Sequence, residues 1–76
     1  MTLKDAKAIV EFLENEGVDD VRLHKDYSGR GMYGTTVAGI YGVNPIWIGW
    51  AAGRLGLKER DLPFRQDSLG MDTIVY

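Results

Sequence analysis

The residues best suited to binding chemistry lie in one glycine-rich segment, Tyr27 to Gly34. Its three glycines are Gly29, Gly31 and Gly34. Because glycine has no side chain, backbone N–H groups in such a segment can closely approach an anion. Arg30 adds a guanidinium group that binds phosphate through two parallel hydrogen bonds. Tyr27 and Tyr33 add flat rings on which a nucleobase could stack. The segment therefore predicts a cradle for a nucleotide.

The same glycines match the letters G-x-G-x-x-G, but the context of the dinucleotide-binding motif is absent. That motif opens a helix, whereas here the strand-forming residues 35–37 follow. A closer physical analogue is the glycine-rich hairpin that covers nucleotide phosphates in protein kinases. With equal weight, the glycines only satisfy the backbone angles of a long hairpin, and Met32 and the tyrosines pack it. Both interpretations stay open.

A second polar group, Arg65, Asp67 and Ser68, lies near a predicted tight turn. In the functional interpretation, Asp67 accepts hydrogen bonds from a ribose or a base, opposite the segment that holds the phosphate. The simpler alternative is an Asx-type turn beside a solvated arginine.

The other reactive side chains form weaker patterns. Asp20, His24 and Asp26 would share one face of a strand and could seed a metal site, but such a face is more often solvated. Ser28 beside His24 and Asp26 has the residue types of a catalytic triad. It lacks a nucleophile elbow, and neighbours along a strand rarely form the required relay. We therefore expect no metal, no cofactor and no enzyme.

Two helices are predicted from spacing and caps. Apolar residues recur at helical spacing over residues 3–16, with Thr2 as the N-cap and Gly17 as a left-handed stop. Asn44-Pro45 begins a second helix, which runs to a stop at Gly56.

Four strands complete the expected fold. Residues 21–24 alternate between apolar and polar, and residues 35–41 are a suitable partner, so the glycine-rich segment is their hairpin loop. Residues 64–67 and 71–76 predict a second hairpin around a turn at residues 68–70. The order α-β-β-α-β-β predicts an α+β domain, with a small antiparallel sheet of three to four strands packed with two helices.

The second predicted helix has two unusual groups. Gly49, Gly53 and Gly56 lie along one side, at a cost of about 1 kcal/mol in helix propensity for each glycine. Such a smooth side allows close approach to the chain's own sheet, which we favour, or to a second subunit. Trp47 and Trp50 are expected to anchor the core or an interface.

Length and composition limit the classes of protein. The 76 residues allow one domain, residues 1–76, and a domain this small buries only about 60% of its unfolded surface. Without cysteine no disulfide reinforces it, so a homo-oligomer is one way to extend the core. The net charge of −2 without a basic stripe argues against general nucleic-acid binding. The longest apolar stretch, residues 46–52, is too short to span a bilayer, and no secretory signal is visible. We expect an intracellular protein.

Two segments together resemble a known family. Residues 26–34 (DYSGRGMYG) and 67–76 (DSLGMDTIVY) are similar to motifs that occur together in small phage and prophage proteins of the Thoeris anti-defence sponge family. The resemblance implies a homo-oligomer in the cytoplasm of an infected bacterium. Such a protein would sequester a cyclic nucleotide immune signal, of the cyclic ADP-ribose type or a cyclic oligonucleotide, without cleaving it. The loop chemistry and the resemblance together predict these ligand-binding residues: Tyr27, Ser28, Gly29, Arg30, Gly31, Met32, Tyr33, Gly34, Asp67, Ser68, Gly70 and Met71.

A second hypothesis comes from another class of protein. A small phage inhibitor could block a host defence complex by direct protein contact, as anti-CRISPR proteins do. Its acidic outer faces would then cover a basic groove or mimic nucleic acid. A third and less favoured hypothesis is a small enzyme that acts on a nucleotide.

Overall fold

The computed structural model describes residues 1–27, 37–57, 65–69 and 72–76. Its elements follow the order α1 (Leu3–Asn15), β1 (Arg22–Tyr27), β2 (Val37–Tyr41), α2 (Pro45–Leu55), β3 (Gln66–Leu69) and β4 (Asp72–Val75). The predicted α+β class and the α-β-β-α-β-β order are therefore confirmed.

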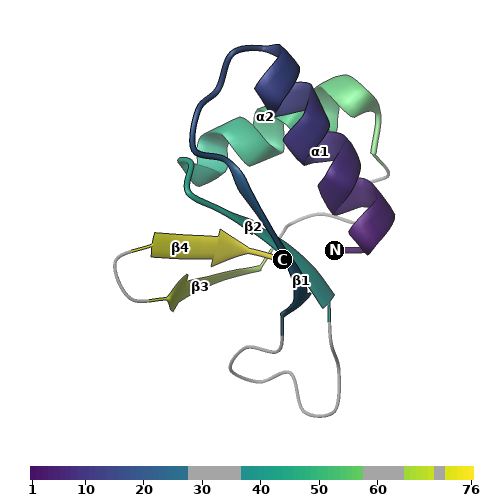
Figure 1. Ribbon diagram of the computed structural model, residues 1–76. Helices are drawn as coiled ribbons and strands as arrows, with labels where there is room; N and C mark the ends of the chain where they lie inside the picture. The colour runs from purple at the N-terminus through teal and green to yellow at the C-terminus, as the bar shows by residue number, and fades with distance from the viewer. Residues whose placement is uncertain (28–36, 58–64, 70–71) are drawn as a thin grey trace.

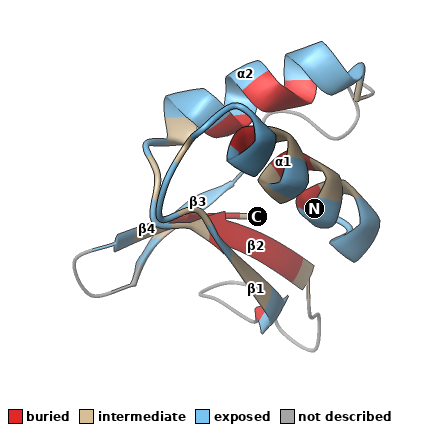
Figure 2. Ribbon diagram, turned by 45° about the horizontal axis from the view of Figure 1, so that its top comes forward, coloured by how far each residue is buried: buried red, intermediate tan, exposed pale blue. Residues whose placement is uncertain are grey.

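The four strands form one antiparallel sheet with the order β1-β2-β4-β3. Both helices lie over the same face of this sheet, as Figures 1 and 2 show. α1 packs against β1 and β2, and α2 packs against α1 and β4. No described helix covers the opposite face, which we call the open face.

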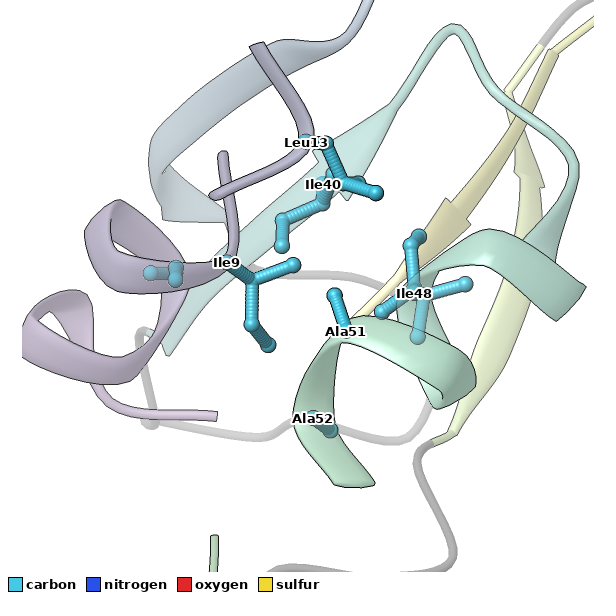
Figure 3. Close-up of a cluster of buried hydrophobic side chains, with 9 residues drawn as sticks. Ile9, Leu13, Ile40, Ile48, Ala51 and Ala52 are labelled. Carbon is cyan, nitrogen blue, oxygen red and sulfur yellow. The ribbon is translucent and has the colours of Figure 1, made fainter. Parts of the chain in front are cut away.

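The main core lies between the helices and the covered face of the sheet. In Figure 3, Ile9 and Leu13 of α1 lie beside Ile40 of β2, with Ile48 of α2 completing the cluster. The nine buried residues of this core are Ala6, Ile9, Leu13, Ala38, Ile40, Ile48, Ala51, Ala52 and Val75. Because four of the nine are alanines, this described core is thin for the two helices and four strands that it supports.

Local signals place the ends of α1. The hydroxyl oxygen of Thr2 accepts a hydrogen bond from the N–H of Asp5 at 3.2 Å. At the other end Gly17 has a φ of 84°, and the N–H of Val18 donates to the carbonyl of Leu13 at 2.9 Å. This is a Schellman motif, and both predicted ends are confirmed.

Capping residues also determine where α2 begins and ends. Oδ1 of Asn44 accepts a hydrogen bond from the N–H of Ile46 at 3.1 Å, and Pro45 takes the first helical position. Gly56 ends the helix with a φ of 70°. The predicted start and stop are confirmed.

The side of α2 that carries Gly49 and Gly53 does not pack on the sheet as we expected. Gly49 and Gly53 are exposed, and no described atom lies within 4 Å of a Cβ built on either residue. Packing of this side against the chain's own sheet is therefore wrong for the described residues, because the inward side of α2 is made by Ile48, Ala51 and Ala52 instead.

The second hairpin has a shorter connection than predicted. Ser68 pairs with Thr73 and Leu69 pairs with Asp72, so both belong to β3 and not to a turn. Only residues 70–71 connect the strands, and they lie outside the described residues. The prediction was wrong because turn composition near Ser68 was given more weight than strand register, which the burial of β4 on both faces determines.

The last residues of the chain continue this hairpin. The N–H of Tyr76 donates to the carbonyl of Arg65 at 2.8 Å, and the N–H of Arg65 donates to the carbonyl of Tyr76 at 2.9 Å. Ile74 and Val75 are buried. The strand predicted over residues 71–76 is confirmed for residues 72–75.

The cap at the start of α2 gives a testable prediction. Replacing Asn44 by alanine leaves the N–H of Ile46 without its acceptor, so Asn44→Ala should lower the free energy of unfolding by about 1 kcal/mol in a denaturant titration. Asn15→Ala is the matched control, because Asn15 is exposed at the end of α1 and its side chain makes no comparable bond to any described residue. Equal effects of the two substitutions would contradict the role of Asn44 as a cap.

Candidate functional site at the base of the first hairpin

A β-bulge in β1 determines which face of the sheet Tyr27 occupies. Between His24 and Tyr27 the pairing with β2 shifts by one residue. Asp26, inside this irregular stretch, has a φ of 38°, a value that aspartate adopts more readily than most residues. In a regular strand Tyr27 would share the helix-covered face with Leu23. The extra residue places Tyr27 on the open face with His24.

A hydrogen bond on the open face joins the two outer strands. The hydroxyl of Tyr27 in β1 donates to Oδ2 of Asp67 in β3 at 2.7 Å. Because β2 and β4 separate these strands, the side chain of Tyr27 must reach across the sheet toward β3. Oδ1 of Asp67 accepts the N–H of Ser68 at 2.9 Å, which orients the carboxylate.

Gly39 and Ile74 form the surface beneath this bond. A Cβ on Gly39 would lie 2.7 Å from Cδ1 and Cγ1 of Ile74, so the absence of a side chain lets Ile74 lie against β2. Ile74 is fully buried and forms a second, smaller apolar cluster with Tyr27. The partly buried residues around this pair are Val37, Tyr41 and Tyr76. Side chains, and no described helix, therefore shield this part of the open face.

Four rings make contact across this face. The His24 ring centroid lies 5.4 Å from that of Tyr27 and 6.2 Å from that of Tyr41. The Tyr76 centroid lies 5.2 Å from that of Tyr27 on the other side. Tyr27 is only 6% exposed, so it does not offer the free stacking surface that the sequence suggested. The ring already packs against protein.

The environment of Tyr27 also fixes its protonation state. The hydrogen bond to Asp67, burial of the ring, and the negative charges of Asp67 and Tyr76 together raise the pKa of Tyr27 to about 12. The hydroxyl therefore stays protonated and donates to Asp67 over the physiological range. A nucleophile or a general base needs the opposite shift, so Tyr27 has the character of a structural donor.

A shallow hollow of about 250 Å³ lies on the helix-covered side of the same hairpin base. Its lining residues are Met1, Thr2, Leu3, Lys25, Asp26, Val37 and Ala38. The carbonyl of Met1 accepts the N–H of Ala38 at 3.2 Å, which holds the start of α1 against β2. Ligand pockets usually measure about 300–1,000 Å³, so this hollow alone would hold only part of a nucleotide.

Three of the predicted ligand-binding residues lie in the described part of the chain. Tyr27 and Asp67 are brought together from two motifs 40 positions apart, and Ser68 follows in β3. The other predicted residues lie outside the described residues: Ser28, Gly29, Arg30, Gly31, Met32, Tyr33, Gly34, Gly70 and Met71. The chain leaves the described structure at Tyr27 and returns at Val37, beside both the Tyr27–Asp67 bond and the hollow.

The sequence analysis did not identify the contacts among the rings of His24, Tyr27, Tyr41 and Tyr76. It also did not identify the role of Gly39. The signal was available in β2, where Val37, Gly39 and Tyr41 alternate with buried residues and so share a face. The bulge before Tyr27 had no comparable signal.

The metal site that the sequence analysis disfavoured has no regular strand face among the described residues, and the triad includes Ser28, which lies outside them. Asp20 precedes β1 and Asp26 lies in the bulge, so neither shares a regular strand face with His24. No group of three or more histidine and acidic side chains that could hold a metal ion occurs among the residues described. Within that same part of the chain, neither helix is long and apolar enough to cross a membrane.

The raised pKa of Tyr27 predicts a late step in alkaline titration. Of the four tyrosines, Tyr27 should ionise about two pH units above its ordinary value of 10.0, and Tyr27→Phe should remove that late step. Because the unfolded chain ionises first, the stability contributed by this hydroxyl is complete below pH 10 and is lost as pH rises toward 12. Absorbance at 295 nm measures the ionisation. A titration without a late step in the wild-type protein would contradict the hydrogen bond.

The bond also predicts energetic coupling between the outer strands. In a double-mutant cycle of Tyr27→Phe and Asp67→Ala, the coupling free energy should be about 1.5–3 kcal/mol, the range for a hydrogen bond to a charged group. Tyr41→Phe is the control, because its hydroxyl has no hydrogen-bond partner among the described residues; we expect a change below about 0.5 kcal/mol. Additive effects of the two site substitutions would mean that the bond contributes nothing to folding.

Comparisons with known proteins do not assign the chain to a family. No protein-family model matches the chain, and neither does any curated protein or solved structure. Conclusions about function therefore depend on the chain's own residues and their arrangement.

Proposed function

We propose that this chain is a non-catalytic binding protein that captures a cyclic nucleotide signal and holds it intact. The observation that carries the proposal is the 2.7 Å hydrogen bond between Tyr27 and Asp67. It joins the two segments, residues 26–34 and 67–76, whose sequences resemble the phage sponge family. A single site built from both segments requires that the segments lie close together. Two loops with unrelated roles would have no need to lie close together.

The class of ligand follows from the charges of the two segments. Arg30 and the glycine amides of residues 29–34 suit phosphate. The Asp67 carboxylate would repel phosphate but suits ribose hydroxyls or base N–H groups, which are donors. A ligand that satisfies both segments therefore carries phosphate together with ribose or base. The cyclic form, whether cyclic ADP-ribose or a cyclic oligonucleotide, comes from the family resemblance.

Sequestration without cleavage is supported by the chemistry of the described side chains. The raised pKa of Tyr27 removes it as a base or a nucleophile at neutral pH. Among the described residues His24 makes ring contacts with Tyr27 and Tyr41 and no hydrogen bond to an acid or a hydroxyl. The relay that would activate a nucleophile is therefore missing from this part of the chain.

The biological setting in this proposal comes from the resemblance alone. The protein would be phage-encoded, would work in the cytoplasm of an infected bacterium, and would form a homo-oligomer. By lowering the free concentration of an immune signal, it would keep a defence effector inactive.

A second function is favoured by the surface of α2. Ile46, Trp47 and Trp50 are 75%, 45% and 40% exposed. Tryptophan is enriched at the energetic centres of protein interfaces. A small inhibitor that blocks a host defence complex by direct contact would use such a surface, and it would need no nucleotide.

Calorimetric titration tests the first function directly. Cyclic ADP-ribose isomers and cyclic di- and trinucleotides are titrated into micromolar wild-type protein, and at least one should bind and be recovered intact after heat denaturation. Arg30→Ala should abolish this binding with little change in the thermal midpoint, because we expect a charged residue of the predicted hairpin loop to contribute little to folding. Arg22→Ala, at an exposed position in β1, should bind as the wild type does.

The outcomes separate the three hypotheses. Absence of heat with every ligand, together with capture of one defence protein from host lysate, would favour direct inhibition. Recovery of a cleaved or rearranged nucleotide would make the chain an enzyme. Equal loss of binding in Arg30→Ala and Arg22→Ala would point to general charge attraction and would contradict a specific cradle.

A further inference from the structure

The helix α2 is apolar on both its inward and its outward side. Ile48, Ala51 and Ala52 are fully buried against the core. On the outward side Ile46 is 75% exposed, and both tryptophans of the chain, Trp47 and Trp50, lie at the surface. A helix that is apolar on all sides is normally buried on all sides. Residues 45–53 of α2 approach this case, and only Arg54 in the last turn is charged, yet the described residues leave the outward side largely uncovered.

The outward side is ordered and shaped for close packing. The Trp47 and Trp50 rings meet edge to face with centroids 5.6 Å apart, and Phe12 of α1 meets Trp50 at 5.2 Å. Next to these rings Gly49 and Gly53 leave open space where other residues would have a side chain. Bulky ridges beside a smooth groove allow a second helix to approach closely.

We propose that this surface is the contact between two copies of the chain, related by a two-fold axis. We call it the α2 face and define it by Phe12, Ile46, Trp47, Gly49, Trp50 and Gly53. The inference gives a location to self-association and does not depend on the identity of any nucleotide ligand.

Charge favours a second copy over a different partner. The chain contains nine lysine and arginine residues and eleven aspartate and glutamate residues, but none lies between Asn44 and Gly53, and the single charge of α2 is Arg54 in its last turn. In a two-fold interface residues near the axis meet their own copies, so any charge there would meet a like charge. A face whose centre carries no charge, with Arg54 at its end, is therefore compatible with a second copy. A basic or acidic partner would gain nothing from it, because electrostatic complementarity requires opposite charges.

The small hydrophobic core gives a physical reason for two copies of the chain to associate. Four of the nine residues in the main described core are alanines, and the two largest side chains of α2 contribute little to it. Pairing two α2 faces would bury these indole rings and extend the core across the axis. A standard interface covers about 800 Å² per partner, against a total surface of 5236 Å² for the chain. A helix of 11 residues is only about 16 Å long, so we expect a modest, reversible dimer.

Sedimentation velocity and native mass spectrometry over about 1–200 µM protein test the proposal. The wild type should shift from its 8.5 kDa monomer to a dimer as concentration rises. Gly53→Lys and Ile46→Asp should each weaken the dimer at least about ten-fold, because each places an unpaired charge in an apolar contact. Both changes are at exposed positions, and lysine and an N-terminal aspartate suit a helix, so the monomer should stay folded.

Gln66→Lys is the matched control, because it adds the same charge at an exposed position on the outer strand β3. It should dimerise like the wild type. A wild type that stays monomeric at 200 µM would overturn the proposal, and so would an oligomer that Gly53→Lys and Ile46→Asp leave intact. Binding of a monomeric wild type to phosphatidylcholine vesicles would assign the α2 face to a lipid surface instead. Nucleotide binding by a monomeric variant would leave the proposed function standing, so the two ideas fail independently.

Discussion

The hydrogen bond between Tyr27 and Asp67 connects the two outer strands of the sheet, and the packing of the open face depends on it. Two local features make it geometrically possible. The bulge in β1 turns Tyr27 away from the helices, and Gly39 lets Ile74 lie flat beneath it. Either feature alone would be insufficient, because a tyrosine on the covered face or a side chain at Gly39 would each prevent the reach across β2 and β4. The described sheet thus packs against helices on one face and carries the Tyr27–Ile74 cluster on the other.

This arrangement changes the role of Tyr27 in any binding site. The sequence suggested a stacking surface, whereas the buried ring and the donated hydroxyl make Tyr27 an anchor for the residues that follow it. A segment that leaves from a fixed residue loses less conformational entropy when a ligand orders it. Asp67 then has two roles in the proposal: its Oδ2 accepts the bond from the anchor, and each carboxylate oxygen, already bonded to Tyr27 or to Ser68, can accept a further donor from a ligand. The proposed cradle depends on the Tyr27–Asp67 bond for its position. Binding sites in general need a layer of residues that holds the ligand-contacting residues in place.

Local signals in the sequence were sufficient for the helices and for the α-β-β-α-β-β order of elements along the chain. Thr2, Gly17, Asn44 and Gly56 each act within one turn of helix, so a single sequence can reveal them. Features that depend on pairing between distant residues could not be read in this way. Strict alternation places Tyr27 with Leu23 on the covered face, and only the register against β2 shows the extra residue. The turn between β3 and β4 was misplaced for the same reason. Of the candidate site, the sequence identified Tyr27 and Asp67 as relevant, but not the bond between them.

The two proposed surfaces lie on opposite sides of the molecule, and this limits how they can be combined. α2 packs on the covered face of the sheet, so the α2 face points away from the strands, while the Tyr27–Asp67 bond lies on the open face. A two-fold dimer through the α2 face therefore leaves both open faces directed outward, with one complete copy of the Tyr27–Asp67 region in each subunit. A pocket shared between subunits would instead require the open faces to meet. A dimer cannot pair through the α2 face and through the open faces at the same time. Pairing through the α2 face therefore implies two independent ligand sites, one in each subunit. These sites would show no cooperativity arising from a shared pocket.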